Sequence, residues 1–327
     1  MKTFLILASL ILACFSAQFA FGQQSVIQPD TANPFWTKDF VRVEIQSSKD
    51  KALEPAIMYK TTSTTPQPLL VCLHSWTADY RQEDSAALIA KAKNWNYIHP
   101  NFRGPGWNPA GCGSELAIAD IDDAIQFMLK NANVNPKEVH IYGRSAGGHA
   151  AMLAYMKLKY PAKTFSSWVG ISNFVDWHFE TGTRELPQHK QLMIATGDTV
   201  HPNFAEMKKR SPFFQPLPNN RSGAKLFLYT GIHDGYLGSV PVTQAINFYN
   251  RLIKERFPND KKSLVPDSDA LELLAKRTYA RLNPSLNDKL DGRIIHYQKE
   301  KGNVKLVVFE GKHEMFTNTI IKTVERE

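Results

Sequence analysis

The sequence predicts an α/β fold with a mostly parallel central sheet and helices on both faces. Three observations carry this prediction: short apolar runs recur along the chain, segments with helical periodicity separate them, and turn residues lie between the two. A short continuous apolar run is typical of a strand buried on both faces, as the strands of a parallel sheet are. Because such strands alternate here with helices, crossover helices must cover both sides of the sheet.

Each predicted element follows from its own pattern. The strands are predicted at residues 40–46, 56–60, 69–73, 97–102, 138–142, 165–171, 226–230 and 304–309. The helices, which have apolar residues at helical spacing, are predicted at residues 83–95, 114–129, 147–160, 242–257 and 269–281, with another after the last strand. Residues 173–218 and 258–303 do not fit the simple alternation. We expect these insertions to shape a pocket rim, because ligands bind at the carboxyl ends of the strands in such sheets.

The N-terminus, residues 1–22, is predicted to be a secretory signal peptide. Lys2 precedes an apolar run from Phe4 to Phe15, and small residues follow as far as Gly22. The run is shorter than the roughly 20 apolar residues that a transmembrane helix needs. We therefore expect residues 23–327 to form one domain that is exported to the periplasm or out of the cell. Lipidation at Cys14, which would attach the protein to a membrane, stays open as an alternative.

Charge and cysteine content narrow the class of protein. The formal net charge of +8 is spread along the chain, and neither a Lys/Arg block nor a nucleic-acid-binding motif is visible. This pattern argues against a nucleic-acid partner. It favours attraction to a polyanionic substrate, although a solvated basic surface explains it equally well. Cys72 lies in an apolar run and is expected to be a buried thiol, while a disulfide to Cys112 stays open.

A G-x-S-x-G sequence follows the predicted strand at residues 138–142. Gly143 and Gly147 flank Ser145 on what must be a tight, strained turn, because side chains there would collide with the strand and the helix. This turn places the serine Oγ above the sheet edge, so Ser145 is the predicted nucleophile of an α/β-hydrolase. The N–H groups of Ala146 and Trp76 are predicted to form the oxyanion hole, with Ser75 next in line for the second donor.

The acid and the base are expected after later strands, in the order nucleophile, acid, histidine. Asp234 follows the strand at residues 226–230, and His313 follows the last strand. The histidine can take the serine proton while the carboxylate fixes its tautomer. Asp176 and Asp198, inside the first insertion, are rival acids. Packing or loop roles are expected for His149 and His233, while His201 and His296 lack a strand immediately before them.

The residues resemble α/β-hydrolases related to the catalytic domain of the prolyl oligopeptidase family, in particular secreted bacterial esterases of plant-polysaccharide breakdown. The resemblance covers most of residues 23–327 and rests on residues 73–76, 101–105, 112–116, 143–148, 176–177, 231–235, 238–241 and 311–314. It implies Ser145, Asp234 and His313 as the triad, and no cofactor. A metal site is not expected either, since His313-Glu314 lacks the second histidine of H-E-x-x-H.

The resemblance also bears on the substrate. Peptidases of that family carry a propeller ahead of the hydrolase domain, and too few residues precede the first predicted strand to hold one. This difference favours a carboxylic ester over a peptide, and a pectin methylesterase is the sharpest hypothesis. A carbohydrate acetylesterase, a single-domain serine peptidase and a non-catalytic polysaccharide-binding protein are the alternatives.

Candidate substrate-binding residues follow from that hypothesis. Arg103 and Arg144 are candidates to hold a uronate carboxylate, because a guanidinium pairs with a carboxylate bidentately. A salt bridge within the fold is the competing role for Arg144. Trp76, Trp107 and Trp177 are candidates to stack on sugar rings, although packing in the core accounts for them equally well.

Overall fold

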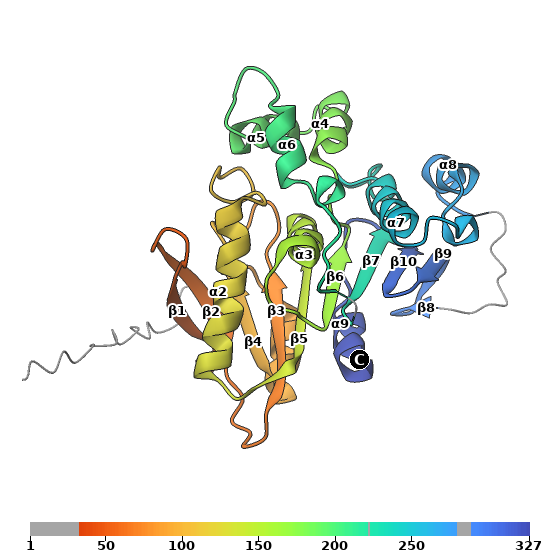
Figure 1. Ribbon diagram of the computed structural model, residues 1–327. Coiled ribbons are helices and arrows are strands. Elements are labelled where there is room, and N and C mark those ends of the chain that lie inside the picture. The colour runs from red at the N-terminus through yellow and green to blue at the C-terminus, as the bar shows by residue number, and fades with distance from the viewer. Residues whose placement is uncertain (1–32, 222, 280–288) are drawn as a thin grey trace, which may run out of the picture.

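The computed structural model describes residues 33–221, 223–279 and 289–327 (Figure 1). The predicted signal peptide and Cys14 lie outside the described residues. The sheet has the strand order β1-β2-β4-β3-β5-β6-β7-β10-β9-β8. Its strands are β1 (Val41–Gln46), β2 (Leu53–Tyr59), β3 (Gln67–Leu73), β4 (Asn96–Pro100), β5 (Val134–Arg144), β6 (Thr164–Trp168), β7 (Lys225–Gly231), β8 (Lys289–Leu290), β9 (Arg293–Lys301) and β10 (Val304–Phe309).

The central part of the sheet is parallel, as the sequence predicts. Every neighbouring pair from β4 through β3, β5, β6 and β7 to β10 runs in the same direction. The strands at the two edges pair antiparallel. The parallel strands are joined by helices, so their carboxyl ends meet at one edge of the sheet.

Helices cover both faces of the sheet, and strand alternation divides the core between them (Figure 1). Leu69 and Val71 of β3 pack in one apolar cluster with residues of α2 (Glu115–Asn131), α3 (Ala146–Lys157) and α7 (Thr243–Arg256). Leu70 and Cys72 point to the other face, because successive strand residues alternate sides. There they join residues of α1 (Ser85–Ala92) and α9 (Thr317–Arg326). The doubly covered sheet confirms the predicted fold class.

The first predicted insertion is helical. Residues 173–218 form α4 (Phe174–Thr183), α5 (Gln188–Ala195), α6 (Phe204–Arg210) and a short 3-10 helix, η1 (Pro212–Phe214). Asn173 begins α4 as its N-cap, since its side-chain oxygen accepts hydrogen bonds from the N–H groups of Val175 and Asp176. In Figure 1 α4, α5 and α6 gather at one end of the sheet, beyond the point where β6 leads into α4.

The second predicted insertion needs a correction. Its middle contains η2 (Lys261–Ser263) and α8 (Asp267–Lys276), but β9 lies at its end and pairs antiparallel with β10. Buried Tyr297 and partly buried Ile295 join different core clusters, because the pairing of β9 with β10 shifts register between Val308 and Phe309. Residues 293–301 therefore extend the sheet and do not form part of a pocket rim.

Cys72 and Cys112, the two cysteines in the described residues, are free thiols and are not joined by a disulfide. Both are buried, and burial raises the pKa of Cys72 well above its usual range and that of Cys112 to about 12. Both thiols therefore stay protonated and act as small apolar residues. Among the described residues, no helix combines the length and the apolar character needed to cross a membrane.

Candidate active site

Ser145 lies on a strained turn between β5 and α3. Its backbone adopts φ 60° and ψ −118°, and its N–H donates to the carbonyl of Trp168 on the neighbouring strand β6, at 2.9 Å. A positive φ is uncommon for a residue other than glycine and persists only where the surroundings enforce it. Helix α3 begins at Ala146, directly after the turn, so its N-terminus faces the serine. This is the geometry expected of a nucleophile at a strand-to-helix elbow.

The flanking glycines are required by close backbone approach. A Cβ at Gly147 would lie 2.0 Å from the carbonyl oxygen of Leu73. A Cβ at Gly143 would lie 2.5 Å from the carbonyl carbon of Gly147. Real Cβ atoms do not approach backbone so closely, so both positions need glycine if α3 is to pack against β3 and β5.

Asp234 and His313 come from adjacent parallel strands. Residues Gly231 of β7 and Phe309 of β10 are paired, and the two side chains follow a few residues beyond those ends. The Oδ2 atom of Asp234 accepts a hydrogen bond from Nδ1 of His313 at 2.7 Å. With the proton on Nδ1, the other ring nitrogen is free to accept one, which is the tautomer that a general base needs.

The carboxylate of Asp234 is held in place by backbone as well as by the histidine. Its Oδ1 atom accepts hydrogen bonds from the N–H groups of Gly235, at 2.9 Å, and Val240, at 3.1 Å. The residue is buried, while the His313 side chain is about one quarter exposed. The acid is thus fixed and shielded, and the base remains open on one side to a reacting group.

The rival acids lie elsewhere. Asp176 is in the first turn of α4, where partial burial raises its pKa. Asp198 accepts hydrogen bonds from the N–H groups of Val200 and His201, and these bonds lower its pKa. Within the described ranges neither carboxylate is hydrogen-bonded to a histidine ring. The geometry therefore favours Asp234 as the acid.

The loop after β3 offers the second oxyanion donor. The N–H of Ser75 is already donated to Oε1 of Gln82 at 2.9 Å. The N–H groups of Trp76 and Ala146 have no acceptor among the described residues, so both are free for a ligand. This pattern favours Trp76 over Ser75. His74 braces the same loop, since its ring nitrogens contact the carbonyls of Ser75 and Asn101.

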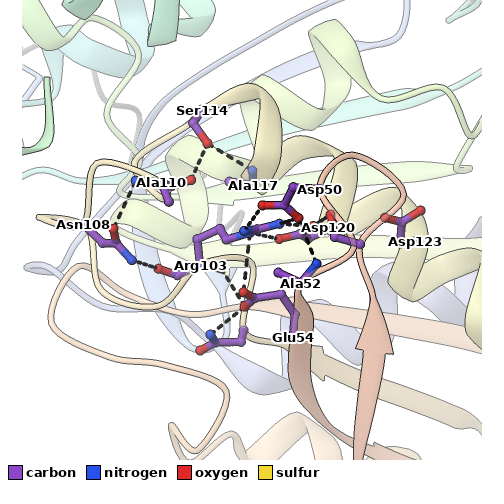
Figure 2. A network of polar contacts seen from close by, with 12 residues as sticks. Asp50, Ala52, Glu54, Arg103, Asn108, Ala110, Ser114, Ala117, Asp120 and Asp123 are labelled. Atoms are coloured by element: carbon purple, nitrogen blue, oxygen red, sulfur yellow. Dashed lines mark hydrogen bonds and ion pairs between the residues drawn. The ribbon is translucent and has the colours of Figure 1, made fainter. Parts of the chain in front are cut away.

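Arg103 does not face a substrate, which corrects its predicted role in uronate binding. Figure 2 shows its guanidinium enclosed by carboxylates from distant parts of the chain: two bonds to Asp50, at 2.7 and 2.8 Å, and two to Asp120, at 2.5 and 3.2 Å. Glu54 lies 3.4 Å away. The side chain is buried, and the carboxylates raise the pKa of Arg103 and lower that of Asp50. Arg103 therefore ties the β1–β2 hairpin to α2.

This network predicts a large effect on stability. We expect Arg103→Met to lower the free energy of unfolding by about 3–5 kcal/mol, because it leaves the buried carboxylate of Asp120 without its partner. Arg42→Met, which removes a partly exposed pair with Glu44, should cost less than about 1 kcal/mol. Urea denaturation of both variants would measure the difference. Undiminished stability of Arg103→Met would contradict the structural role.

Of the three tryptophans predicted to stack on sugar rings, two are packed in the core. Trp177 is 1% exposed and donates its indole N–H to the carbonyl of Ser239 at 2.9 Å. Trp76 is 5% exposed and donates to Oε1 of Gln191 at 2.7 Å, and the two rings meet edge to face. Neither presents a face on which a sugar can stack, which corrects the role predicted for them. Trp107 is partly buried and packs against the apolar cluster that contains Trp76 and Trp177.

Arg144 differs from Arg103. It is partly buried beside Ser145, and its guanidinium makes no hydrogen bond or ion pair in the part of the chain that the structure describes. The competing role for this residue, a salt bridge within the fold, is therefore not seen there. Arg144 directly precedes the nucleophile in the sequence, and a guanidinium without a protein partner is available to an anionic or carbonyl-bearing substrate.

Three further histidines, His149, His233 and His296, have structural partners. His149 is buried and stacks on Phe174, and burial lowers its pKa to about 4. His233 and His296 each bond one oxygen of Glu310 at 2.8 Å. Glu310, which the sequence analysis overlooked, thus links the loop of the acid to the loop of the base. The described residues contain no group of three or more side chains able to hold a metal ion.

Comparison with known proteins gives consistent results. A family model described as the prolyl oligopeptidase family matches residues 89–266, more than half of the chain, including Ser145 and Asp234. Among curated proteins, the uncharacterized peptidase YtmA of Bacillus subtilis is 30% identical over 139 residues, which are 41% of this chain and 50% of that protein. The chain thus spans half the length of that relative.

Solved structures show the same fold. An acylaminoacyl peptidase of Pyrococcus horikoshii matches 67% of this chain with a TM-score of 0.52 and 17% identity, over 35% of its own length. Prolyl oligopeptidase B from Galerina marginata matches 69%, with a TM-score of 0.54 and 18% identity, over 33% of its length. A puromycin-hydrolyzing peptidase of Mycobacterium tuberculosis matches 88%, with a TM-score of 0.54 and 16% identity, over 38% of its length. At such identities the likeness is one of fold, and the chain spans between 33% and 38% of each protein.

Proposed function

Because the chain belongs to the prolyl oligopeptidase family and is a serine hydrolase, we propose that it cleaves short peptides or acylated amino acids through an acyl-enzyme on Ser145. One observation carries the proposal: the hydrogen bond of 2.7 Å between Asp234 and His313, at the same sheet edge as the strained turn of Ser145. Support for peptide substrates comes from the relatives, because the named proteins that match are peptidases. They support the peptidase alternative better than the pectin methylesterase hypothesis.

The proposed reaction uses the groups in an established order. His313 takes the proton from Ser145 Oγ as that oxygen attacks the carbonyl carbon, and Asp234 stabilises the imidazolium that forms. The N–H groups of Trp76 and Ala146 bind the negative oxygen of the tetrahedral intermediate. The imidazolium then protonates the leaving amine, the C–N bond breaks, and the acyl group stays on the serine. Water, deprotonated by His313, then attacks the acyl carbonyl, the C–O bond to Ser145 breaks, the acyl group leaves as a carboxylic acid, and His313 returns the proton to Ser145 Oγ.

A substrate panel tests this proposal. Purified protein would be assayed with N-acylated aminoacyl and prolyl p-nitroanilides, and separately with methylated and acetylated pectins, measuring methanol and acetate. We expect amide turnover that disappears in Ser145→Ala. Release of methanol or acetate without any amide turnover would overturn the peptidase proposal in favour of a carbohydrate esterase. No turnover of any substrate would favour the polysaccharide-binding alternative.

A carbohydrate ester remains the second candidate because of Arg144. This partly buried residue directly precedes the nucleophile in the sequence, its guanidinium has no partner among the described residues, and the carboxylate of a uronate is a suitable partner for it. Peptide substrates offer carboxylates as well. Arg144 is therefore proposed to select an anionic group near the scissile bond in either class of substrate.

Substitution of Arg144 separates this role from a structural one. Arg144→Gln should lower kcat/KM for an anionic ester or peptide by about ten- to a hundredfold relative to a neutral one, because a charge-assisted hydrogen bond contributes about 1.5–3 kcal/mol. Arg42→Gln, which removes the same charge at a surface ion pair, is the matched control. Rising salt should weaken turnover of the anionic substrate, since the attraction between charges is screened. Equal loss of both substrates, with no salt dependence, would contradict the selective role.

A further inference from the structure

Arg184, at the end of α4, holds the loop that follows the catalytic acid. Its Nη1 atom donates hydrogen bonds to the carbonyls of Gly235 and Gly238, both at 2.7 Å. Its Nη2 atom donates to the carbonyl of Ser239 at 2.9 Å. A fourth bond, from Nε, goes to the carbonyl of Glu180 within α4, at 3.1 Å. One guanidinium thus joins both ends of the loop at residues 235–239 to the insertion helix.

The same loop lies directly against the acid and the base. The N–H of Gly235 at its start, and that of Val240 immediately after it, are the two backbone donors to Asp234 Oδ1. A Cβ at Gly238 would lie 2.2 Å from that oxygen and 2.9 Å from the Cβ of His313. A shift of the loop by a fraction of this distance would therefore change the hydrogen bonds that orient Asp234.

At its tip the loop is held by two backbone hydrogen bonds, from the N–H groups of Tyr236 and Leu237 to the carbonyl of His233, and by the guanidinium of Arg277, which lies over the Tyr236 ring at 4.1 Å. Its tip residues Tyr236 and Leu237 are 66% and 58% exposed, so apolar packing does not fix the conformation. Gly235, with a φ of +80°, and Gly238 give the backbone more freedom than other residues would. Besides Arg184, the indole N–H of Trp177 reaches the carbonyl of Ser239. Both side chains come from α4, so this helix supplies the side-chain hydrogen bonds that hold the loop carbonyls.

Helix α4 is itself a firm support. Gln244, in the first turn of α7, accepts hydrogen bonds from the N–H groups of Ser172 and Asn173 through Oε1, at 3.0 and 2.9 Å. Its Nε2 atom donates to Glu180 at 3.2 Å. Gln244 is buried, so these bonds anchor the start of α4 to the helix that follows the acid loop. The guanidinium of Arg184 is thereby presented from a fixed position.

We propose that Arg184 is a positioning residue: by binding the carbonyls of Gly235, Gly238 and Ser239, it keeps the amides of the acid loop aimed at Asp234 and so keeps the His313 ring oriented toward Ser145. This inference rests on the proposed function, in which Asp234 is the acid. Arginine suits the task because its planar fork of donors serves several carbonyls at once, whereas a lysine acts as a point charge. The insertion then contributes to catalysis through the acid loop and not only through a pocket rim.

The test is kinetic. Arg184→Ala should lower kcat for a small neutral ester by about a hundredfold, because a misplacement of about 1 Å in the catalytic groups costs that much. The KM for this ester should change little, since the donors of Arg184 are engaged by backbone carbonyls and have no role in the proposed binding of the acyl group. Guanidinium ion, added well below denaturing concentrations, should restore part of the kcat of Arg184→Ala by occupying the vacated site. Arg184→Lys should keep the charge and fold, and still lose most of the kcat.

A matched control is available in α7. Arg251 also donates to backbone carbonyls, those of Pro212 and Gln215, but these belong to η1 and the residue after it, not to the acid loop. Arg251→Ala should leave kcat nearly unchanged and show no rescue by guanidinium. Thermal unfolding of every variant would separate loss of fold from loss of positioning. If Arg184→Ala fails to fold, Arg184→Lys still decides the question.

The outcomes distinguish this inference from the proposed function. Full kcat in a folded Arg184→Lys or Arg184→Ala, together with an inactive Asp234→Asn, would overturn the positioning role and leave the triad standing. Full activity in Asp234→Asn would instead overturn the assignment of the acid on which both rest. A loss in Arg184→Ala that appears only in KM, or that guanidinium does not relieve, would also contradict positioning.

Discussion

Ser145→Ala is expected to lower kcat by about a millionfold on any substrate that the protein turns over, as loss of the nucleophile does in hydrolases with such a triad. The alanine adds no bulk to the turn, and the hydrogen bond from its N–H to the Trp168 carbonyl is retained. The fold should therefore survive. Burst and steady-state kinetics with an activated ester would measure the loss.

Ser167→Ala is a suitable control for that measurement. Ser167 is a buried serine of β6 that pairs with Gly143 of β5 and approaches Gly148, and it undergoes the same chemical change without a role in the proposed reaction. We expect it to retain most of the wild-type kcat. If Ser145→Ala kept more than a small fraction of the activity, the nucleophile would have been assigned to the wrong residue.

Asp234→Asn is expected to lower kcat by about 10⁴-fold, because an amide at this position favours the wrong tautomer of the histidine. In the structure Oδ2 of Asp234 accepts from Nδ1 of His313, and Oδ1 is occupied by two backbone N–H groups. An asparagine must place an NH₂ group against one of these donors. It therefore either turns the histidine or breaks the backbone contacts.

Asp176→Asn and Asp198→Asn provide the comparison. Asp176 lies in the first turn of α4, and Asp198 accepts hydrogen bonds from the N–H groups of Val200 and His201. We expect each substitution to change kcat by less than tenfold, because neither contacts a histidine ring among the described residues. A crippling effect at either position, with Asp234→Asn nearly unaffected, would move the acid to that residue.

Much of the site could be predicted because its signals are local. The turn at Ser145 needs glycines at fixed offsets, and the acid and base follow recognisable apolar strands. The order of the strands along the chain then determines which loops meet. The N-cap of α2 is equally local, since Ser114 Oγ accepts from the N–H of Ala117.

The roles of Arg103 and Arg184 could not be predicted from the sequence, because their partners lie far away along the chain. Arg103 has the appearance of an anion-binding residue, and only its contacts with Asp50 and Asp120 show that it is already paired. Arg184 has no motif around it, and its role follows from carbonyl groups some 50 residues later. Residues 294–297 of β9 are rich in β-branched and aromatic side chains, which is typical of a strand. The strand was missed because the whole of residues 258–303 was interpreted as an insertion.

The pairing of β7 with β10 has a consequence for folding. Asp234 and His313 are 79 positions apart, and they meet only when residues 304–309 dock beside β7. Such non-local pairings form slowly, because loop-closure entropy opposes them until the contacts are made. The six tryptophans, by contrast, all precede β7 and β10 in the sequence, at positions 36, 76, 95, 107, 168 and 177. Of these, Trp168 contacts Tyr229 of β7 and Phe309 of β10. A refolding chain can therefore recover much of its native fluorescence while it is still inactive, and the return of activity reports the docking of β10.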